Sequence, residues 1–349
     1  MANLLITGGA GFIGSHAALV LLEAGHQLVV LDNYANSSPE ALRRVASMAG
    51  PEAGARLRVI EGDIRSTADL ERAFAASTAL GGGAVDAVIH FAGLKAVSES
   101  VAEPLRYWDV NLSGSRQLVS AMQAHGCRTL VFSSSATLYG YPETVPIPET
   151  AAIAPINPYG HSKAAVEQLL ADVAASEPGW RIARLRYFNP VGAHPSGQIG
   201  EDPSGIPNNL FPFVSQVAVG RRPQLQVYGG DWPTPDGSGV RDFIHVMDLA
   251  EGHKAALEVL LAEAPQVLTL NLGSGQGHSV LEVAAAFEAA SGRPVPLQIV
   301  DRRPGDAAIT VADPSRAAER LGWRTRRTLA DMCRDGWAWQ GANPQGYGA

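Results

Sequence analysis

The sequence contains few cysteines and no long hydrophobic run. Its 349 residues include only two cysteines, Cys127 and Cys333. Two thiols cannot build the disulfide framework of a small secreted domain, and no metal-ligand spacing surrounds them. No apolar run approaches the roughly 18 residues that a membrane span needs. We therefore expect a cytoplasmic protein with neither a metal site nor a membrane segment.

The sequence also lacks a basic N-terminal region and an excess of positive charge. The apolar residues Leu4, Leu5 and Ile6 run into a glycine at Gly8, which indicates the start of a strand rather than a signal peptide. The formal net charge is −7 and the pI is near 5.7. A general nucleic-acid binder would need a basic face, so we exclude that class. The length suffices for one large domain or two.

Glycines are concentrated where the first predicted strand meets the first predicted helix. The apolar run Asn3–Thr7 predicts a buried parallel strand, and a glycine-rich loop follows it. Gly8 would permit the tight turn, Gly11 would let the backbone approach a pyrophosphate, and Gly14 would allow close helix packing. The next predicted strand ends at Asp32, whose carboxylate would receive a ribose 2′-hydroxyl. This βαβ pattern indicates a dinucleotide site and favours NAD over NADP.

The third predicted strand, Leu57–Glu61, is followed by Asp63, which has two possible roles. Its carboxylate could accept a hydrogen bond from an adenine amino group. It could instead cap the helix predicted over residues 66–76, although Ser66 can also fill that place. The residues alone leave both roles open.

The fourth predicted strand begins at Ala87 and runs into the small residues Ala92 and Gly93, which would leave room for a cofactor. We interpret His90, inside this strand, as a structural residue rather than a base. A long helix is predicted over Pro104–His125, and Asn111 lies on a face of it that could turn inward.

A serine at a strand end and a Tyr-x-x-x-Lys pair are the candidate catalytic residues. Ser135 follows the fifth predicted strand, at the carboxyl edge where ligands bind in open α/β sheets. Tyr159 and Lys163 share one face of a predicted helix, with Cβ atoms about 5–6 Å apart. A free tyrosine has a pKa of about 10, and a nearby ammonium group favours the phenolate. Each signal is common alone, but together the three residues form a proton-handling set.

Beyond the predicted strand at residues 182–185, the chain leaves the alternating pattern. Tyr187–Pro207 is predicted to be a loop rich in glycine and proline, and so long an irregular segment is usually functional. Asn189 and Asn209 are either turn formers, the role that the bare sequence favours, or amide donors to a sugar or diphosphate. Arg241 and Arg303 are candidates for the diphosphate, because arginine presents a fixed fork of donors. Later elements are predicted at residues 225–228 (strand), 249–261 (helix), 267–270 (a strand that could rejoin the main sheet), 279–290 (helix) and 295–299 (strand).

Nine segments spread along the chain resemble those of one known family. They are Thr7–Gly14, Leu31–Asn33, Glu61–Arg65, His90–Val97, Ser133–Thr137, Pro158–Lys163, Arg186–Ala193, Gly205–Leu210 and Val240–Val246. With them the chain resembles the UDP-glucose 4-epimerases, of the extended short-chain dehydrogenase/reductase group, over essentially its whole length. The blocks Phe91–Val97 and Arg186–Ala193 are the most specific of the nine.

The resemblance implies an α/β fold, with a doubly wound parallel-sheet Rossmann domain and a smaller mixed α/β substrate domain. Residues 1–186, joined by segments near 240–272, would bind NAD, and residues 187–349 would bind the UDP-sugar. The implied activity is the reversible C4 epimerisation of UDP-glucose and UDP-galactose through a transient 4-keto sugar, with NAD tightly bound. The resemblance also implies a homodimer that forms through a four-helix contact of the helices at residues 104–125 and 159–175.

The resemblance also assigns roles to individual residues. Tyr159 would be the catalytic base and acid, Lys163 would tune it and contact the nicotinamide ribose, and Ser135 would assist the sugar hydroxyl. The implied NAD contacts are these three residues with Gly8, Gly11, Phe12, Ile13, Gly14, Asp32, Asn33, Asn36, Ser37, Asp63, Ile64, Phe91, Ala92, Gly93, Lys95, Asn111 and Phe188. The implied substrate contacts are Lys95, Ser135, Tyr159, Phe188, Asn189, Asn209, Leu210, Gln226, Val227, Tyr228, Arg241, Phe243, Arg303, Asp306 and Thr310. Val110 departs from some epimerases, which carry a cofactor-contacting Asn at that position.

Two residue patterns bear on specificity and on rival functions. Thr310 aligns with the pocket wall beside the hexose, where a small residue would admit N-acetylhexosamines such as UDP-N-acetylglucosamine. Ala136 and Thr137 follow Ser135, whereas related dehydratases and decarboxylases place a carboxylate there, so that chemistry is disfavoured. The alternatives are a 4-epimerase of another UDP-sugar, such as a UDP-pentose or UDP-hexuronate, and a non-catalytic NAD-sensing scaffold.

Overall fold

The computed structural model describes residues 1–79, 81, 83–203, 205, 207, 209–303 and 305–348. Ile206, Asn208 and Pro304, which belong to segments discussed above, lie outside the described residues. The chain divides into two compact units. We call Met1–Gly140, Ile153–Arg186 and Ala250–Leu270 the first unit, and Tyr141–Ala152, Tyr187–Leu249 and Asn271–Ala349 the second unit.

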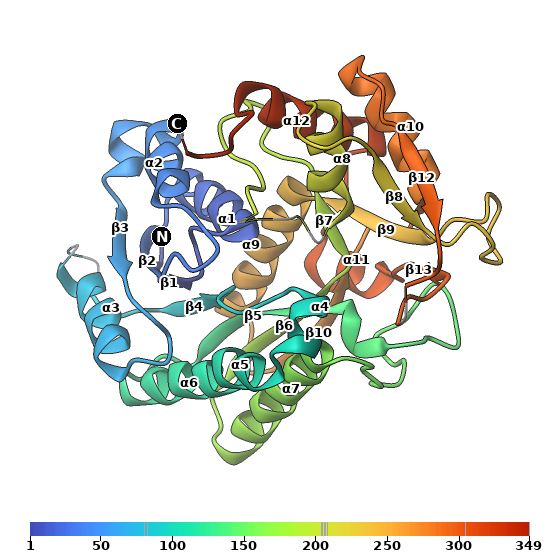
Figure 1. Ribbon diagram of the computed structural model, residues 1–349. Helices are drawn as coiled ribbons and strands as arrows, with labels where there is room; N and C mark the ends of the chain where they lie inside the picture. Colours follow the sequence, from blue (N-terminus) through green and yellow to red (C-terminus); the bar gives the residue numbers. More distant parts are fainter. Residues whose placement is uncertain are drawn as a thin grey trace. The chain divides into compact units, whose positions relative to one another are not determined.

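The first unit is built on a seven-stranded sheet (Figure 1). Its strands are β1 (Asn3–Thr7), β2 (Gln27–Asp32), β3 (Leu57–Glu61), β4 (Ala87–His90), β5 (Thr129–Ser135), β6 (Arg181–Tyr187) and β10 (Val267–Leu272). They lie in the order β10-β6-β5-β4-β1-β2-β3, and β1 pairs in parallel with both β2 and β4. The strand order reverses between β1 and β4, which is where ligands bind in doubly wound sheets. The predicted doubly wound fold is confirmed, and β10 rejoins the main sheet.

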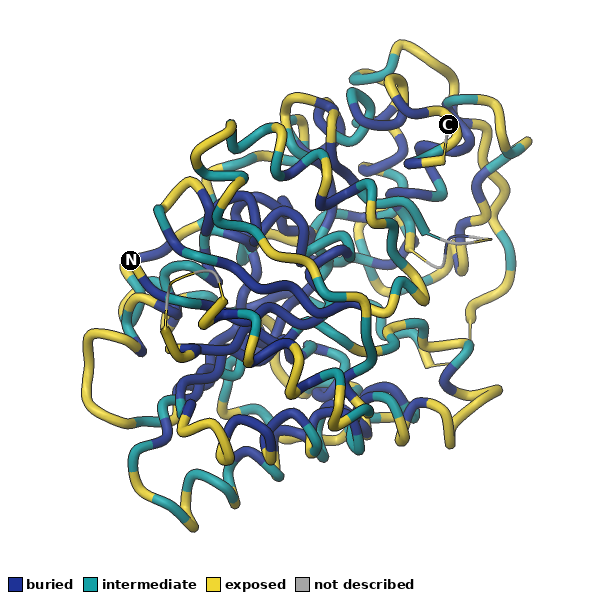
Figure 2. Tube along the Cα trace, turned by 90° about the vertical axis from the view of Figure 1, so that its left-hand side faces the viewer, coloured by how far each residue is buried: buried dark blue, intermediate teal, exposed yellow. Residues whose placement is uncertain are grey.

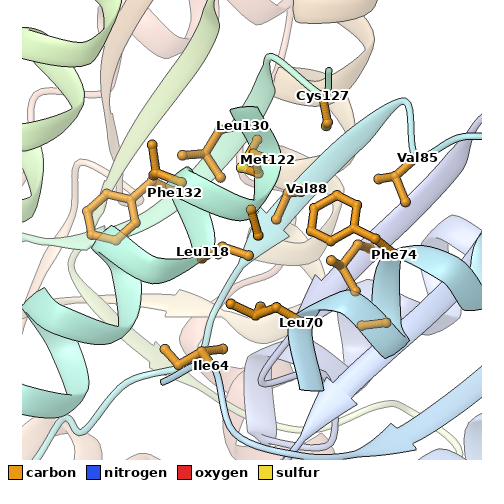
Figure 3. Close-up of a cluster of buried hydrophobic side chains, with 14 of the residues drawn as sticks. Ile64, Leu70, Phe74, Val85, Val88, Leu118, Met122, Cys127, Leu130 and Phe132 are labelled. Atoms are coloured by element: carbon orange, nitrogen blue, oxygen red, sulfur yellow. The ribbon is translucent and has the colours of Figure 1, made fainter. Parts of the chain in front are cut away.

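Helices cover this sheet and bury most of its strands. They are α1 (Phe12–Glu23), α2 (Pro39–Gly54), α3 (Thr67–Ala79), α6 (Gly114–Ala124), α7 (Pro158–Ser176) and α9 (Val246–Ala262), with the short α4 (Val97–Ala102) and α5 (Pro104–Tyr107). Figure 3 shows Leu70 and Phe74 of α3, Leu118 and Met122 of α6, and Phe132 of β5 gathered in one hydrophobic cluster. Figure 2 shows how buried, intermediate and exposed segments follow one another along the chain. Every residue of β4 is buried. Both faces of β4 are therefore covered, as is usual for a central strand of a parallel sheet.

The long helix predicted over Pro104–His125 is not regular. The structure divides it into α5, a π-helical turn η1 (Trp108–Ser113) and α6. The prediction was right about the extent of the helix and wrong about its regularity. The wider turn contains Asn111, whose buried side chain bonds to residues outside the helix, and π turns often occur at functional sites.

The second unit contains two smaller sheets. One is formed by β7 (Asn189–Val191), β9 (Val240–His245), β11 (Gly277–Ser279) and β13 (Ile309–Thr310), and the other by β8 (Leu225–Tyr228) and β12 (Leu297–Val300). The segment predicted as loop over Tyr187–Pro207 therefore contains a strand. That prediction was wrong because β7 is specified by its parallel pairing with β9, which is distant in sequence.

Four helices complete the second unit: α8 (Leu210–Ala218), α10 (Val280–Ser291), α11 (Ser315–Leu321) and α12 (Leu329–Ala342). The apolar faces of α8, α10 and α12 meet around Phe211 and Phe287, whose ring centroids lie 6.2 Å apart. Ser279 caps α10 and Thr328 caps α12, each in a capping box. No helix within the described residues is long and apolar enough to cross a membrane.

Candidate active site

The glycine-rich loop joins β1 to α1 and packs against the residues that follow β4. Gly8 has φ +70°, and a Cβ on it would lie 2.5 Å from the backbone nitrogen of Ala92. A Cβ on Gly14 would lie 2.4 Å from the carbonyl oxygen of Gly8. Both positions therefore require glycine. At Gly8 a side chain would strain the backbone and clash with Ala92, and at Gly14 it would clash with Gly8.

The loop leads into the N-terminus of α1, which is open to an anion. The N-cap residue, Gly11, makes no side-chain capping bond, so the first N–H groups of α1 are available to a ligand. Beside it, the buried Asp32 carboxylate accepts hydrogen bonds from the nitrogens of Ala10 and Tyr34 at 2.9 Å and from the hydroxyl of Ser37 at 2.8 Å. An uncapped helix N-terminus and a fixed carboxylate fit the pyrophosphate and ribose of a dinucleotide.

Asp63 bonds to the neighbouring polar side chains rather than capping α3. Asn33 donates to its carboxylate at 2.9 Å, and Arg65 forms an ion pair with it at 2.8 Å. The bond from Arg65 lowers the pKa of Asp63 to about 2. The capping role falls to Ser66, whose hydroxyl accepts the N–H of Asp69 at 3.2 Å. An adenine contact of Asp63 stays a prediction.

His90 lies inside the fold with both ring nitrogens engaged. Nδ1 lies 2.7 Å from the hydroxyl of Thr7, and Nε2 lies 2.9 Å from the hydroxyl of Ser115. Burial lowers the pKa of His90 to about 3, so the ring is neutral. This environment agrees with the structural role that we expected for His90.

Asn111 connects the loop after β4 to the helix that carries the candidate base. Its amide accepts the N–H of Leu94 at 2.8 Å and donates to the Leu94 carbonyl at 3.1 Å. The same amide donates to the hydroxyl of Ser162 in α7 at 2.9 Å. A Cβ on Gly93 would lie 3.0 Å from its oxygen. Asn111 thus turns inward as predicted, and it fixes the backbone where the cofactor was expected.

The start of α7 is defined by its sequence. Asn157 caps the helix by accepting the N–H of Gly160 at 2.9 Å, and Pro158 occupies the first turn. A Cβ on Gly160 would lie 2.9 Å from the Cβ of Pro155, so the helix starts close against the preceding loop. Tyr159 is therefore held within the first turn and is 9% exposed.

The three candidate catalytic residues lie together at the carboxyl end of β5. The hydroxyl of Ser135 lies 2.8 Å from that of Thr137 and also forms a hydrogen bond with Tyr159. Lys163 is 5% exposed, and its Nζ donates to the carbonyl of Ser133 at 2.8 Å. The helix and the strand end thus bring the predicted Ser/Tyr/Lys set into one place.

Burial acts on the protonation of both members of the pair. It raises the pKa of Tyr159, and the hydrogen bond with Ser135 opposes that rise. It lowers the pKa of Lys163 to about 8, and the negative charge of Glu167 opposes that fall. At neutral pH the chain alone therefore keeps Tyr159 protonated and Lys163 mostly charged. The phenolate expected from the sequence requires a further positive charge nearby.

The other predicted cofactor contacts of the first unit differ in exposure. Phe12 and Ile13 are half-buried at the start of α1, and Phe91 lies 4.8 Å from the ring of His253. Ile64 is 5% exposed and belongs to the hydrophobic cluster of α3 and α6, so its side chain packs in the core. The exposed members are Asn33, Asn36, Gly93 and Lys95.

Two predicted diphosphate ligands of the second unit share one carboxylate. Asp306 lies 3.0 Å from Arg303 and 4.0 Å from Arg241. Burial lowers the pKa of Arg241, and Arg303 also lies over the ring of Tyr228, 5.3 Å from its centroid. Thr310 pairs with Arg241 in the register of β13 and β9. Two guanidinium groups beside one carboxylate leave a net positive charge for an anion.

Other predicted substrate contacts are partly buried. Val227 is 1% exposed and Phe243 is 2% exposed, and both belong to the core of the second unit. Their side chains pack there, so a ligand contact of either stays a prediction. Gln226 and Tyr228 are exposed, and the Tyr228 hydroxyl donates to Gln226 at 3.0 Å. Phe188 is buried, Asn189 and Leu210 are half-buried, and Asn209 is exposed and donates to Glu201 at 3.1 Å.

The structure adds residues that the sequence did not single out. The ring of Tyr107 packs edge-on against Tyr159, with centroids 6.5 Å apart. Glu167 lies one turn beyond Lys163 and forms a buried ion pair with Arg186. The four-residue spacing from Lys163 to Glu167 was visible in the sequence, but the partner on β6 was not.

Comparisons with known proteins agree with this architecture. The family model described as GDP-mannose 4,6 dehydratase matches residues 5–336. The UDP-glucose 4-epimerase 3 of Oryza sativa subsp. japonica is 53% identical, with 100% of this chain and 92% of that protein covered. The UDP-glucose 4-epimerase of Bacillus subtilis (strain 168) is 52% identical, with 99% and 98% covered. A crystal structure of UDP-glucose 4-epimerase from Bifidobacterium longum, in complex with NAD⁺ and UDP, has a TM-score of 0.92 at 49% identity and covers 99% of each chain.

The sheet, the glycine loop and the Ser/Tyr/Lys set define the class as the extended short-chain dehydrogenases/reductases. Within that class, the similarity extends over nearly the full length of both relatives. The chain belongs to the UDP-glucose 4-epimerase family.

Proposed function

We propose that the protein is an isomerase that interconverts UDP-glucose and UDP-galactose by inverting C4 of the hexose, with NAD as a tightly bound cofactor. One observation carries this proposal most directly. Ser135, Tyr159 and Lys163 lie together at the carboxyl end of β5, on the sheet edge that also carries the glycine loop. A proton-handling set beside a dinucleotide site suits an alcohol that is oxidised and then reduced.

Tyr159 accepts the proton of the sugar O4 and later returns it. Because burial raises the pKa of Tyr159 in the chain alone, the phenolate needs two positive charges beside it. Lys163 supplies one of them from a fixed position on the Ser133 carbonyl. The oxidised nicotinamide ring supplies the other. Ser135, already bonded to Tyr159, orients the sugar hydroxyl.

Bound NAD supplies the hydride acceptor and donor for C4. The 4-keto sugar that forms rotates before reduction, so that the opposite face of C4 is presented and the configuration is inverted. No net redox change occurs, and the cofactor has no need to leave. The uncapped N-terminus of α1, together with Asp32 and Asn33, is proposed to bind NAD.

The proposed domain roles follow from the same residues. The first unit binds NAD, and the second unit binds the UDP moiety through Arg241 and Arg303. Both guanidinium groups suit a diphosphate, because each presents several N–H donors in a plane. Rotation of the keto sugar requires a firm grip on UDP and a loose grip on the hexose. The positive charges of Arg241 and Arg303 would hold the diphosphate firmly and leave the hexose free to rotate.

The sugar specificity is the finer part of the proposal. Thr310, a small residue in register with Arg241, would leave room for an N-acetyl group, so UDP-N-acetylglucosamine is a further proposed substrate. A 4-epimerase of a UDP-pentose or UDP-hexuronate is the alternative within the family. A 4,6-dehydratase needs a further proton-removing carboxylate, and Ala136 and Thr137 stand where it would be expected.

We further propose that the protein is a homodimer that acts in galactose metabolism in the cytoplasm. Large apolar residues on the consecutive segments α4, α5 and η1 support the dimer, because they are exposed in the single chain. Val97 is 43% exposed, Val101 63%, Leu105 81% and Trp108 36%. A patch of this kind marks an interface more often than a free surface. Leu105→Lys should convert a dimer into a monomer in light scattering, and an unchanged mass would exclude this surface.

Isotope transfer tests the proposed reaction. We would convert UDP-galactose carrying deuterium at C4 and follow UDP-glucose by proton NMR. The proposal predicts that the product retains deuterium at C4 in ordinary water, because the same hydride leaves and returns. Replacement by solvent hydrogen would contradict the hydride mechanism.

A further inference from the structure

Behind the candidate base, four buried polar side chains of the first unit form one network. They are Ser134, Tyr139, Glu167 and Arg186. The reaction proposed above uses none of them directly. We propose that Glu167, itself fixed by Arg186, is a positioning residue that keeps Lys163 in place and charged during turnover. This inference rests on the proposed epimerase function.

The centre of the network is a two-pronged ion pair. Arg186 Nε lies 3.0 Å from Glu167 Oε1, and Arg186 Nη2 lies 2.6 Å from Glu167 Oε2. The two side chains are only 4% and 3% exposed. The hydroxyl of Ser134 donates to Glu167 Oε1 at 2.6 Å, and Arg186 Nη1 donates to the hydroxyl of Tyr139 at 2.9 Å. Paired, charge-assisted bonds of this geometry fix the orientation of both groups.

The network touches each segment that carries a catalytic residue. Ser134 directly precedes Ser135 in β5, and Tyr139 ends the short 3-10 helix η2 (Ala136–Tyr139) that begins just after Ser135. Glu167 lies one helical turn beyond Lys163 in α7. The ion pair therefore ties the strand end, the turn after it and the catalytic helix together.

Glu167, a member of this network, also supplies a negative charge that favours the ammonium form of Lys163. A lysine buried without an opposite charge loses its proton readily, by up to about 3–5 pKa units when fully buried. Lys163 is 5% exposed, and Glu167 is the group whose negative charge favours its ammonium form. On β4, His90 is neutral at physiological pH because burial lowers its pKa to about 3. The charge of Glu167 therefore opposes the loss of the Lys163 proton that burial favours.

Other charged groups on elements packed against α7 are engaged elsewhere. On α4, α5 and η1, Glu99 bonds to Tyr107 and Arg106, and Asp109 pairs with Arg65. Arg116 on α6 is exposed. On β6, Arg186 is paired with Glu167 itself. On α7, Tyr159 lies one turn before Lys163 and burial raises its pKa, whereas His161 is exposed.

The variant that tests the proposal removes both buried charges. Glu167→Gln alone would leave Arg186 buried and unpaired, which destabilises a fold for reasons unrelated to Lys163. The double variant Glu167→Gln/Arg186→Met avoids this problem, because it leaves no uncompensated charge. We expect it to turn over UDP-galactose roughly 10–100-fold more slowly at pH 8, with little change in KM, and to lose activity at least about one pH unit earlier on the basic side.

The pKa of Lys163 can be measured directly, without an activity assay. The chain has three lysines, Lys95, Lys163 and Lys254. Labelling them with ¹³C at Cε gives three NMR signals, and Lys163→Arg identifies the one that belongs to Lys163. In the NAD-bound protein we expect the double variant to lower the pKa of Lys163 by at least about one unit. Lys95 and Lys254 should titrate as in the unaltered protein.

A second ion pair, which fixes the C-terminal end of α7, provides the matched control. Arg128 and Glu177 pair at the far end of α7, and each side chain is 33% exposed. Glu177→Gln/Arg128→Met should leave both the Lys163 titration and the pH profile unchanged. Glu167→Asp keeps the charge and should hold the pKa of Lys163 within about half a unit of its normal value. It also serves as the test if the double variant does not fold.

The outcomes separate this inference from the proposed function. A wild-type Lys163 titration in the double variant, or equal shifts of the Lys163 pKa in Glu167→Asp and in the double variant, would overturn the role of Glu167. A shift of Lys163 in a protein that never converts UDP-galactose would support that role and refute the epimerase proposal instead.

Discussion

Replacing Tyr159 with Phe removes one hydroxyl and leaves the packing of the ring intact. The ring is 9% exposed and lies edge-on to Tyr107, so Phe occupies the same volume. The folded state loses the hydrogen bond with Ser135, worth about 1 kcal/mol. For a protein of 349 residues, we expect the thermal midpoint to change by only about 1–2 °C.

Turnover should respond far more strongly than stability. A positioned proton donor or acceptor contributes roughly 10²–10⁴-fold to rate, or about 3–5 kcal/mol of barrier. Tyr159 is the proposed acceptor of the O4 proton and its later donor. We therefore expect kcat for UDP-galactose to fall at least about 100-fold in Tyr159→Phe, with the KM and the content of bound NAD nearly unchanged.

Tyr107→Phe is the matched control, because it removes a second buried hydroxyl close by. That hydroxyl lies 2.7 Å from a carboxylate oxygen of Glu99 and 2.7 Å from the carbonyl oxygen of Ala96, which share its one proton. Its loss should cost at least as much stability, since one partner is charged, while kcat stays within about threefold of wild type. More than about a tenth of the activity in Tyr159→Phe, or an equal loss in Tyr107→Phe, would contradict the role of Tyr159 as the proton acceptor and donor.

Three further predictions concern the second unit and the thiols. Arg303→Ala should weaken UDP binding roughly 10–100-fold in calorimetry, whereas Arg302→Ala should have little effect; equal losses would remove the diphosphate assignment. Thr310→Tyr should selectively abolish conversion of UDP-N-acetylglucosamine, and equal loss with UDP-glucose would contradict the pocket-wall hypothesis. Burial raises the pKa of Cys127 to about 11 and that of Cys333 to about 12, so both should stay protonated at pH 8 and resist thiol reagents until denaturation; rapid labelling of the native protein would count against this.

The first unit could be predicted from sequence because its signals are local and consecutive. A buried strand, a glycine turn, a helix and a strand ending at Asp32 follow one another, and each constrains the next. Ser135 and Tyr159 could be brought together in advance for the same reason. One ends a parallel strand and the other starts a helix at the carboxyl edge of the same sheet.

The features that the sequence missed are specified by distant partners. The three residues of β7 form a strand through pairing with β9, and the π turn at Trp108–Ser113 coincides with bonds from Asn111 to other segments. Hydrophobic periodicity reports neither interaction. The ion pair of Glu167 and Arg186 joins a helix to a strand in the same way.

The second unit shows the same limit at the level of single side chains. Val227 and Gln226 are neighbours in β8, yet one is buried and the other exposed. Which of them faces the core depends on what packs against each face of the β8 and β12 sheet. A resemblance can assign both residues to a ligand, but it cannot tell a backbone contact from a side-chain contact.

The central claim is epimerisation by a protein that retains its own NAD. Its most direct test is proton NMR of the purified protein with UDP-galactose and no added cofactor. We predict that UDP-glucose appears and that NADH does not accumulate. Stoichiometric NADH would indicate a dehydrogenase instead, and no conversion even after NAD is added would contradict the account.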